Sequence, residues 1–155
     1  MHRLVILVLI ALVSFSVHAD FNSGLAAYEV GDYATALGEW TPLAEEGMAE
    51  AQYNVGLIHQ HGRSVTADPA LALEWFIKAA EGGYDRAQYR AAEMFESGNG
   101  TKKELVQAHL WFSMAGENKY LDSRKRRKRV AKQMSPEQIA MADMLARHKR
   151  QAVKD

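Results

Sequence analysis

The chain repeats itself at an interval of 36 residues. The string AQYNVGLIHQHG at residues 51–62 returns as AQYRAAEMFESG at residues 87–98, and Trp75 is matched by Trp111. A unit with a period of this length cannot bury its apolar face alone, so successive units must stack on one another. The repeat therefore predicts a solenoid of helical hairpins, a fold whose surfaces are suited to docking other molecules.

The unit at residues 49–84 has the pattern of two helices joined by a polar turn. Apolar side chains recur at helical spacing along its first half, at Ala51, Val55 and Ile58. Asp68 followed by Pro69 supplies an N-cap and a residue suited to the first turn of a helix. We therefore expect one helix at about 49–61 and a second that begins at residue 69 and ends at the glycines 82–83.

The phase of the repeat extends backward but not forward. The residues that precede Ala72, Phe76, Ala80 and Gly83 by 36 positions are Ala36, Trp40, Ala44 and Gly47. Beyond residue 120 the period is lost, and a Ser-Pro-Glu-Gln string at 135–138 is typical of a further helix start. We predict an all-α, right-handed α-α solenoid of about three helix-turn-helix repeats, at 21–48, 49–84 and 85–120, closed by basic capping helices at 121–155.

Small and aromatic residues recur with this period. Alanines allow neighbouring helices to approach closely, and the rings at Trp75, Phe76, Trp111 and Phe112 are expected to fill the gaps between units. Rings that recur at the repeat interval are interpreted as core rather than as a cofactor site.

These residues resemble the Sel1-like repeat (SLR) family, a relative of the tetratricopeptide repeat. The residues that carry the resemblance are Ala51, Val55, Gly56, His59, Gly62, Asp68, Ala72, Trp75, Ala79, Ala80 and Gly83. His59 replaces the usual aromatic residue, and Ala92 and Gly116 depart from the pattern in the third unit, whereas the first unit is similar to an ordinary tetratricopeptide repeat. The resemblance implies a bacterial adaptor or scaffold that binds peptides or protein segments on the concave face lined by the first helices.

Residues 1–19 have the layout of a secretory signal. Arg3 precedes an apolar run at 4–13, and small residues end at Ala19, so we expect cleavage before Asp20. The alternative is a retained membrane anchor, although the apolar run is shorter than the roughly 20 residues that span a bilayer. We expect an exported, most simply periplasmic, protein, and with no cysteine its fold cannot depend on disulfides.

Charge is distributed unevenly along the chain. Residues 20–100 hold 13 acidic and four basic residues, whereas residues 101–155 hold six acidic and 14 basic ones. A run of six consecutive basic residues comprises Arg124, Lys125, Arg126, Arg127, Lys128 and Arg129. This run is interpreted either as part of a solvated capping helix or as a patch for an anionic membrane surface or for the acidic body of a second copy. Nucleic acid is not expected as a partner, because no aromatic residues are interleaved with the charges.

Motifs for catalysis, metals and cofactors were not found. The chain has no Cys, no HExxH, no G-x-S-x-G and no G-x-G-x-x-G string. His59 and His61 are separated by about 200° on a helix, so a solvated turn is favoured over a metal site. We therefore assign no catalytic, metal-binding or cofactor-binding residue and expect no enzyme and no cofactor.

The function that we predict is non-enzymatic binding of a protein or peptide in the bacterial envelope. Polar residues of the first helices are the candidates for this surface, at Gln52, Asn54, Gln88 and Arg90, together with the basic run. Two alternatives remain open. One is an anionic-surface or self-association module that acts through the basic run. The other is a small-ligand binder or enzyme that uses a pocket between repeats, which would need convergent polar groups.

Overall fold

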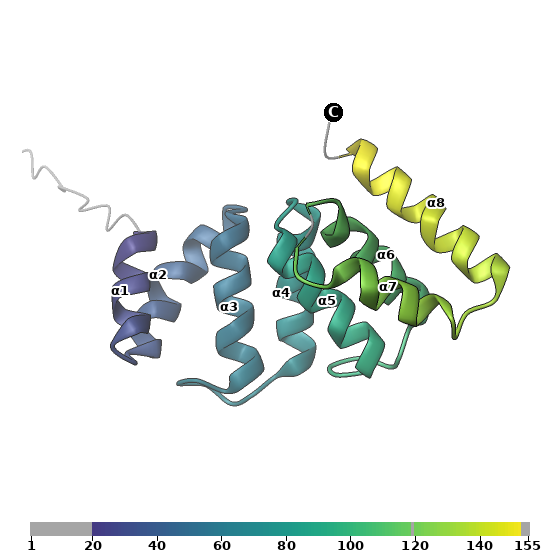
Figure 1. Ribbon diagram of the computed structural model, residues 1–155. Helices are drawn as coiled ribbons and strands as arrows, with labels where there is room; N and C mark the ends of the chain where they lie inside the picture. Colours follow the sequence, from purple (N-terminus) through teal and green to yellow (C-terminus); the bar gives the residue numbers. More distant parts are fainter. Residues whose placement is uncertain (1–19, 119, 153–155) are drawn as a thin grey trace, which may run out of the picture.

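The computed structural model describes residues 20–118 and 120–152, and this part of the chain consists of eight helices and their connections, without a strand (Figure 1). The helices are α1 (Phe21–Glu29), α2 (Tyr33–Glu45), α3 (Ala49–His61), α4 (Pro69–Glu81), α5 (Asp85–Ser97), α6 (Leu105–Glu117), α7 (Ser123–Ala131) and α8 (Pro136–Ala152). None of them combines the length and apolar character needed to cross a membrane. The signal predicted at 1–19 lies outside the described residues.

The first six helices form three antiparallel pairs that stack in a row. Each helix packs on the next one along the chain, both within a pair and between pairs. In Figure 1 the row runs from α1 to α7, with the first helix of each pair toward the viewer. We call the surface formed by α1, α3, α5 and α7 the first-helix face. The predicted all-helical solenoid is confirmed.

Aspartates begin three of the helices. The carboxylates of Asp20, Asp32 and Asp68 accept hydrogen bonds from the backbone N–H groups of the first turn of α1, α2 and α4, at 3.0–3.1 Å. Gly62 and Gly98 end α3 and α5 in the left-handed conformation, with φ of 63° and 76°. These residues fix helix boundaries in the second unit that agree with the expected 49–61 and 69–81.

Large rings and small residues interlock in the core. Trp40, Phe76 and Phe112 are almost fully buried among alanines of the neighbouring helices. A methyl group at Gly56 would lie 2.7 Å from the ring of Phe76, so this glycine lets α3 and α4 approach closely. Trp75 differs from its expected role, because it is only partly buried and its ring faces the ammonium group of Lys78 at 4.1 Å.

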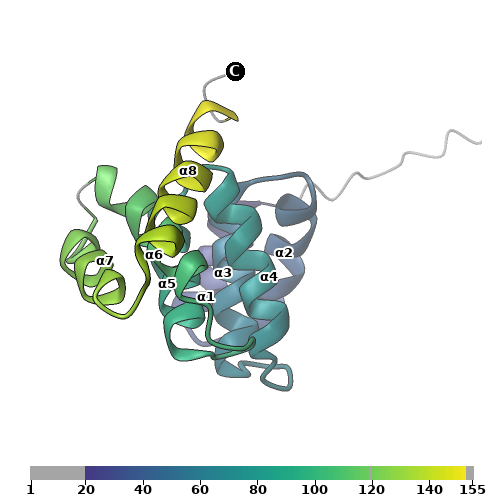
Figure 2. The same ribbon diagram turned by 90° about the vertical axis from the view of Figure 1, so that its right-hand side faces the viewer.

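The C-terminal helices α7 and α8 both pack on α6 and do not pair with each other. Helix α7 packs on α6 as α5 packs on α4, and its buried residues Ser123 and Val130 stand 36 positions after the buried Ala87 and Met94. Helix α8 packs on α6 instead of lying along α7, and Figure 2 shows it across the end of the stack. Because charged side chains occupy most of α7, it has no apolar stripe left for a second helix.

Candidate functional site

Each of the three repeats carries one pair of tyrosine rings on or near the first-helix face. The pairs are Tyr28–Tyr33, Tyr53–Tyr84 and Tyr89–Tyr120, with ring centroids 5.1, 5.3 and 5.6 Å apart. In all three, the rings meet edge to face, an arrangement that aromatic quadrupoles favour. The chain has six tyrosines, so every one of them belongs to this series.

A guanidinium group from the following unit lies beside each tyrosine pair. Arg63, from the turn after α3, lies 5.3 Å from the ring centroid of Tyr28 and 4.8 Å from that of Tyr33. Burial would lower the pKa of the Arg90 guanidinium group on α5, but the neighbouring Tyr53 and Glu93 outweigh this effect and raise that pKa. Arginine–tyrosine contacts therefore link adjacent units along one line.

Arg126 of α7 completes the series at the third pair. Its guanidinium group donates to the hydroxyl of Tyr89 at 3.1 Å and to the carboxylate of Glu93 at 2.8 Å. It also pairs with Glu96, which accepts a second ion pair from Arg129 at 2.8 Å. Burial would raise the pKa of Glu96, but the bonds from both arginines outweigh it and hold that pKa below its ordinary value. The carboxylate therefore stays ionised under α7.

The first-helix face is hollowed beside the third tyrosine pair. This hollow has a volume of about 250 Å³ and lies between α5 and the start of α7, and its lining residues are Arg86, Tyr89, Arg90, Glu93, Tyr120 and Leu121. Burial raises the pKa of Tyr89 and Tyr120, so both phenols keep their protons at neutral pH. Leu121 is 66% exposed and offers an apolar contact at the rim. The hollow thus combines cationic, phenolic and apolar groups, which suits a polypeptide segment.

Two of the predicted surface residues have a structural role. The side-chain amide of Gln52 donates to the backbone oxygen of Ala44 at 3.0 Å, and that of Gln88 donates to the oxygen of Ala80 at 3.2 Å. Gln52 is 8% exposed and Gln88 is 3% exposed. Both amides join a first helix to the preceding unit, and neither side chain presents a binding surface. Gln52 and Gln88 are therefore not part of the proposed binding site.

Asn54 and Arg90, the other two predicted residues, are partly exposed on the first-helix face. They occupy the same register as Arg126, at successive intervals of 36 residues. Sequence reasoning missed the tyrosines, Arg63, Arg86 and Glu93. The 36-residue match of Tyr53 to Tyr89 is the sequence signal that could have identified the series.

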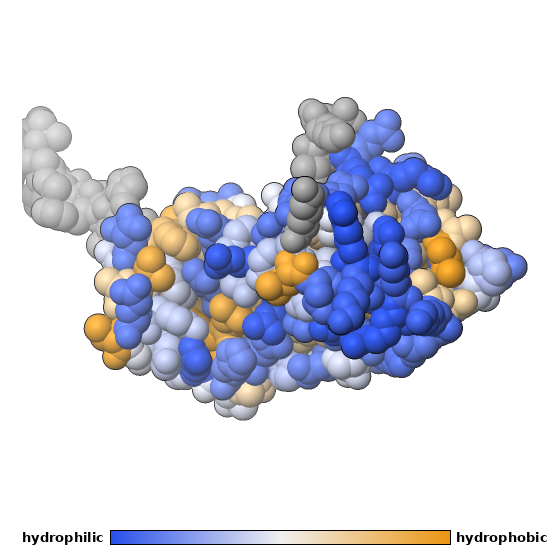
Figure 3. Space-filling model, viewed as in Figure 1, coloured by the Kyte–Doolittle hydropathy of each residue, from blue (hydrophilic) through white to orange (hydrophobic). Residues whose placement is uncertain are grey.

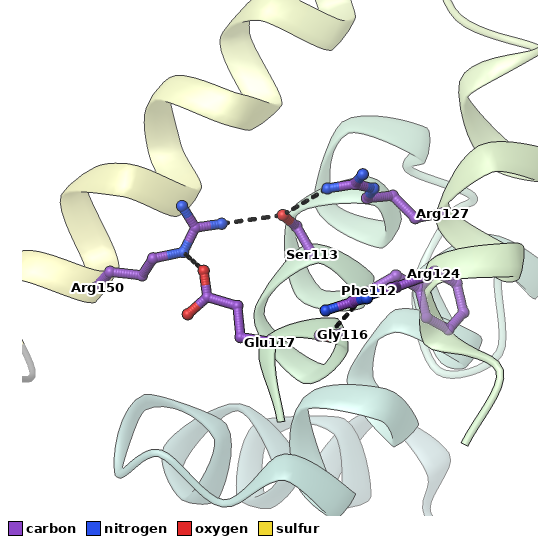
Figure 4. Close-up of a pocket in the computed structure, with 7 residues that line it drawn as sticks. All are labelled: Phe112, Ser113, Gly116, Glu117, Arg124, Arg127 and Arg150. Carbon is purple, nitrogen blue, oxygen red and sulfur yellow. Dashed lines mark hydrogen bonds and ion pairs between the residues drawn. The ribbon is translucent and has the colours of Figure 1, made fainter. Parts of the chain in front are cut away.

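The basic run is divided among three environments. Arg126 and Arg129 face the glutamates of α5, Lys125 and Lys128 are exposed, and Arg124 and Arg127 line a pocket together with Arg150 of α8 (Figure 4). On the surface the run forms the dense hydrophilic patch over α7 in Figure 3. The six charges therefore do not form one uniform binding surface.

His59 and His61 lie near the end of α3, where His61 is exposed. Within residues 20–118 and 120–152, no group of three His, Asp or Glu side chains is placed to hold a metal ion.

Comparison with known proteins identifies the repeats. The family model described as Sel1 repeat matches residues 49–84 and 85–120, which are the second and third units. The first unit, α1–α2, precedes the matched residues and has a shorter connector, at residues 30–32. The resemblance to the Sel1-like repeat family is confirmed for these two units.

Two solved structures share the fold. A protective antigen of uropathogenic Escherichia coli strains, described as displaying an SLR fold, is 28% identical with a TM-score of 0.76 over 83% of this chain. A Sel1 repeat protein from Oxalobacter formigenes is 25% identical with a TM-score of 0.66 over 70% of this chain. The alignments cover 28% and 44% of those two chains, respectively.

One curated relative comes from mouse and is named DAP3-binding cell death enhancer 1. It is 38% identical over 63 residues, which are 40% of this chain and 12% of the mouse protein. This chain therefore spans a small part of that relative.

Proposed function

We propose that this Sel1-repeat chain is a non-enzymatic scaffold of the bacterial envelope that binds a segment of a partner protein along its first-helix face. Sel1-repeat proteins generally act as scaffolds for protein interactions. The mouse relative is named for binding another protein, DAP3, which accords with this class of function.

The observation that carries the proposal is the hollow beside the third tyrosine pair. Tyrosine and arginine are among the residues enriched at the energetic centre of protein interfaces, and here they line one concavity with Leu121 at its rim. The lining includes two arginines, Arg86 and Arg90, and one carboxylate, Glu93, so it carries a net positive charge. The favoured partner is therefore an extended segment that presents a carboxylate next to an apolar side chain.

Crosslinking from within the hollow tests this proposal. A photoreactive amino acid at Leu121 should capture a partner protein in the native envelope, whereas the same group at Met141, which is 54% exposed on α8, should not. The captured partner is then purified and its affinity measured. Arg90→Gln and Tyr120→Ala should each weaken binding about tenfold or more, because both remove groups from the centre of the site. Equal capture from both positions, or affinities unchanged by both substitutions, would contradict the proposal.

Export of the chain is a separate part of the proposal. The signal pattern at residues 1–19 supports it, and so does the position of Asp20, whose carboxylate caps α1 immediately after the expected cleavage site. Mass spectrometry of the protein recovered from a periplasmic extract should give a chain that starts at Asp20. Recovery of the uncleaved chain in the membrane fraction would instead support the anchor.

Anionic surfaces or a second copy of the chain are the second candidate partners. A hollow of about 600 Å³ runs along the outer side of α7, and Lys125, Lys128 and Lys132 line it without a carboxylate partner in the described part of the chain. The ion pairs of Arg126 and Arg129 with glutamates of α5 weaken this candidate, because they neutralise two of the six positive charges of the basic run. Lys125→Gln with Lys128→Gln should abolish sedimentation with vesicles of phosphatidylglycerol, or a salt-sensitive dimer, if this candidate is correct.

A further inference from the structure

Three helices surround a third pocket, at the C-terminal end of the solenoid. It has a volume of about 350 Å³ and lies between α6, α7 and α8. The lining residues, drawn in Figure 4, are Phe112, Ser113, Gly116, Glu117, Arg124, Arg127 and Arg150. The three arginines come from α7 and α8, two helices that scarcely contact each other. Both helices pack on α6, and the pocket lies between them on the surface of α6.

The arginines converge on one face of α6. The hydroxyl oxygen of Ser113 accepts hydrogen bonds from Arg127 at 3.3 Å and from Arg150 at 3.0 Å. Arg124 donates from its Nε to the backbone oxygen of Gly116 at 3.0 Å, which leaves its two terminal nitrogens for another acceptor. A methyl group at residue 116 would lie 3.2 Å from the Arg124 side chain, so the glycine makes room for this arginine.

Positive charge in the pocket is only partly compensated. Glu117 pairs with Arg150, whereas Arg124 and Arg127 form no ion pair within residues 20–118 and 120–152. The lining therefore carries three guanidinium groups and one carboxylate. Like charges brought together around a partly enclosed space repel one another unless a counter-charge enters it.

We propose that this pocket binds a phosphoryl group, independently of the protein-binding surface proposed above. The excess charge of two matches the charge of about −2 that a phosphate monoester carries at neutral pH, whereas a carboxylate would supply only half of it. Guanidinium forks suit tetrahedral oxyanions, since each presents parallel N–H donors to two oxygens. The hydroxyl of Ser113, which accepts from both arginines, has its own proton available as a further donor. The phosphoryl group could belong to a soluble monoester or to a lipid headgroup.

Titration of the purified protein with inorganic phosphate tests the site directly. In an NMR spectrum of the arginine Nε–H groups, the signals of Arg124, Arg127 and Arg150 should shift together and give one dissociation constant, while chloride at equal ionic strength should not reproduce the shift. A parallel experiment measures sedimentation with phosphatidylcholine vesicles that contain phosphatidic acid. Soluble phosphate and lipid are thereby distinguished as sources of the group.

Substitutions on α7 separate a specific site from general electrostatic attraction. Arg127→Gln should weaken binding of the effective probe about tenfold or more, because one charge-assisted donor is lost. Lys128→Gln removes the same charge from an exposed neighbour and should change the affinity less than about twofold. Equal losses in the two variants, or no saturable response to either probe, would overturn the proposal. The titration of the unmodified protein needs no variant, so a substitution that impairs folding would not affect that arm.

Discussion

Arg126 of α7 donates a 2.8 Å hydrogen bond to the carboxylate of Glu93 on α5, and this bond joins the C-terminal segment to the third repeat. Arg126 stands 36 residues after Arg90. Its guanidinium group donates to the hydroxyl of Tyr89 in the unit before it, and Arg90 lies near Tyr53, the tyrosine equivalent to Tyr89. Helix α7 thus continues the series of first helices, although its sequence no longer matches the repeat. What the basic run supplies at this position is a contact between units.

Removal of this contact should destabilise the C-terminal part of the solenoid. Arg126→Gln deletes the ion pairs with Glu93 and Glu96. Glu96, whose side chain is only 13% exposed, then keeps its ion pair with Arg129 but loses the one with Arg126. We expect the free energy of unfolding to fall by about 1.5–3 kcal/mol in urea denaturation. Lys125→Gln on the exposed side of the same helix is the matched control and should change it by less than about 0.5 kcal/mol. Similar values for both variants would contradict a specific role for Arg126.

Stability should fall in acid through Glu96. Its pKa lies below 4.5 in the folded protein, so the unfolded chain binds its proton first and the stabilisation is present above pH 4.5. It is lost as the pH falls through the lowered, folded-state pKa. Urea unfolding should therefore show that the free energy of unfolding declines less between pH 7 and pH 3 in Glu96→Gln than in the parent protein.

The difference between the two proteins isolates this residue, since Asp32, Asp122 and Glu137 also have lowered pKa values and contribute equally to both curves. Parallel curves across the acid range would show that Glu96 is not coupled to folding.

The periodicity of the sequence predicted the helix pairs, their boundaries and the buried rings well. Trp40, Phe76 and Phe112 stand at successive intervals of 36 residues and are all buried. A repeat makes such predictions reliable because each unit faces nearly the same neighbours. The same argument located the first unit, whose connector is shorter than the others.

Contacts made by side chains from different units could not be predicted in this way. Gln52 and Gln88 look like solvent-exposed positions of a helix, yet each reaches a carbonyl oxygen of the preceding unit. The position of α8 could not be predicted from the sequence either, because α8 packs on the part of α6 that α7 does not cover. Charge alone likewise did not show that Arg124 and Arg127 would line one pocket together with Arg150 of α8.

The two buried glutamines should contribute similar stability, because they occupy equivalent positions. Gln52→Ala and Gln88→Ala each remove one buried hydrogen bond, to Ala44 and Ala80 respectively, and we expect losses of about 1–2 kcal/mol in the free energy of unfolding. Asn54→Ala, on the partly exposed side of α3, serves as the control and should stay within about 0.5 kcal/mol. A loss in one glutamine variant but not in the other would argue against their structural equivalence.

Two glycines in helices should respond in opposite directions to the same substitution. Gly38→Ala adds a methyl group to α2 where no atom lies within 4 Å, so the gain in helix propensity should raise the stability by about 0.5–1 kcal/mol. Gly56→Ala gains the same propensity, but its methyl group would lie 2.7 Å from the ring of the buried Phe76. Relief of that overlap requires α3 and α4 to move apart, and we expect a net loss of about 1–3 kcal/mol. Thermal unfolding followed by circular dichroism measures both changes. A gain in stability for Gly38→Ala with a loss for Gly56→Ala would locate the constraint in the α3–α4 contact, whereas stabilisation by both would show that α3 and α4 can move apart without cost, as the buried Ala92 at the equivalent position of the third unit shows that a methyl group can be accommodated there.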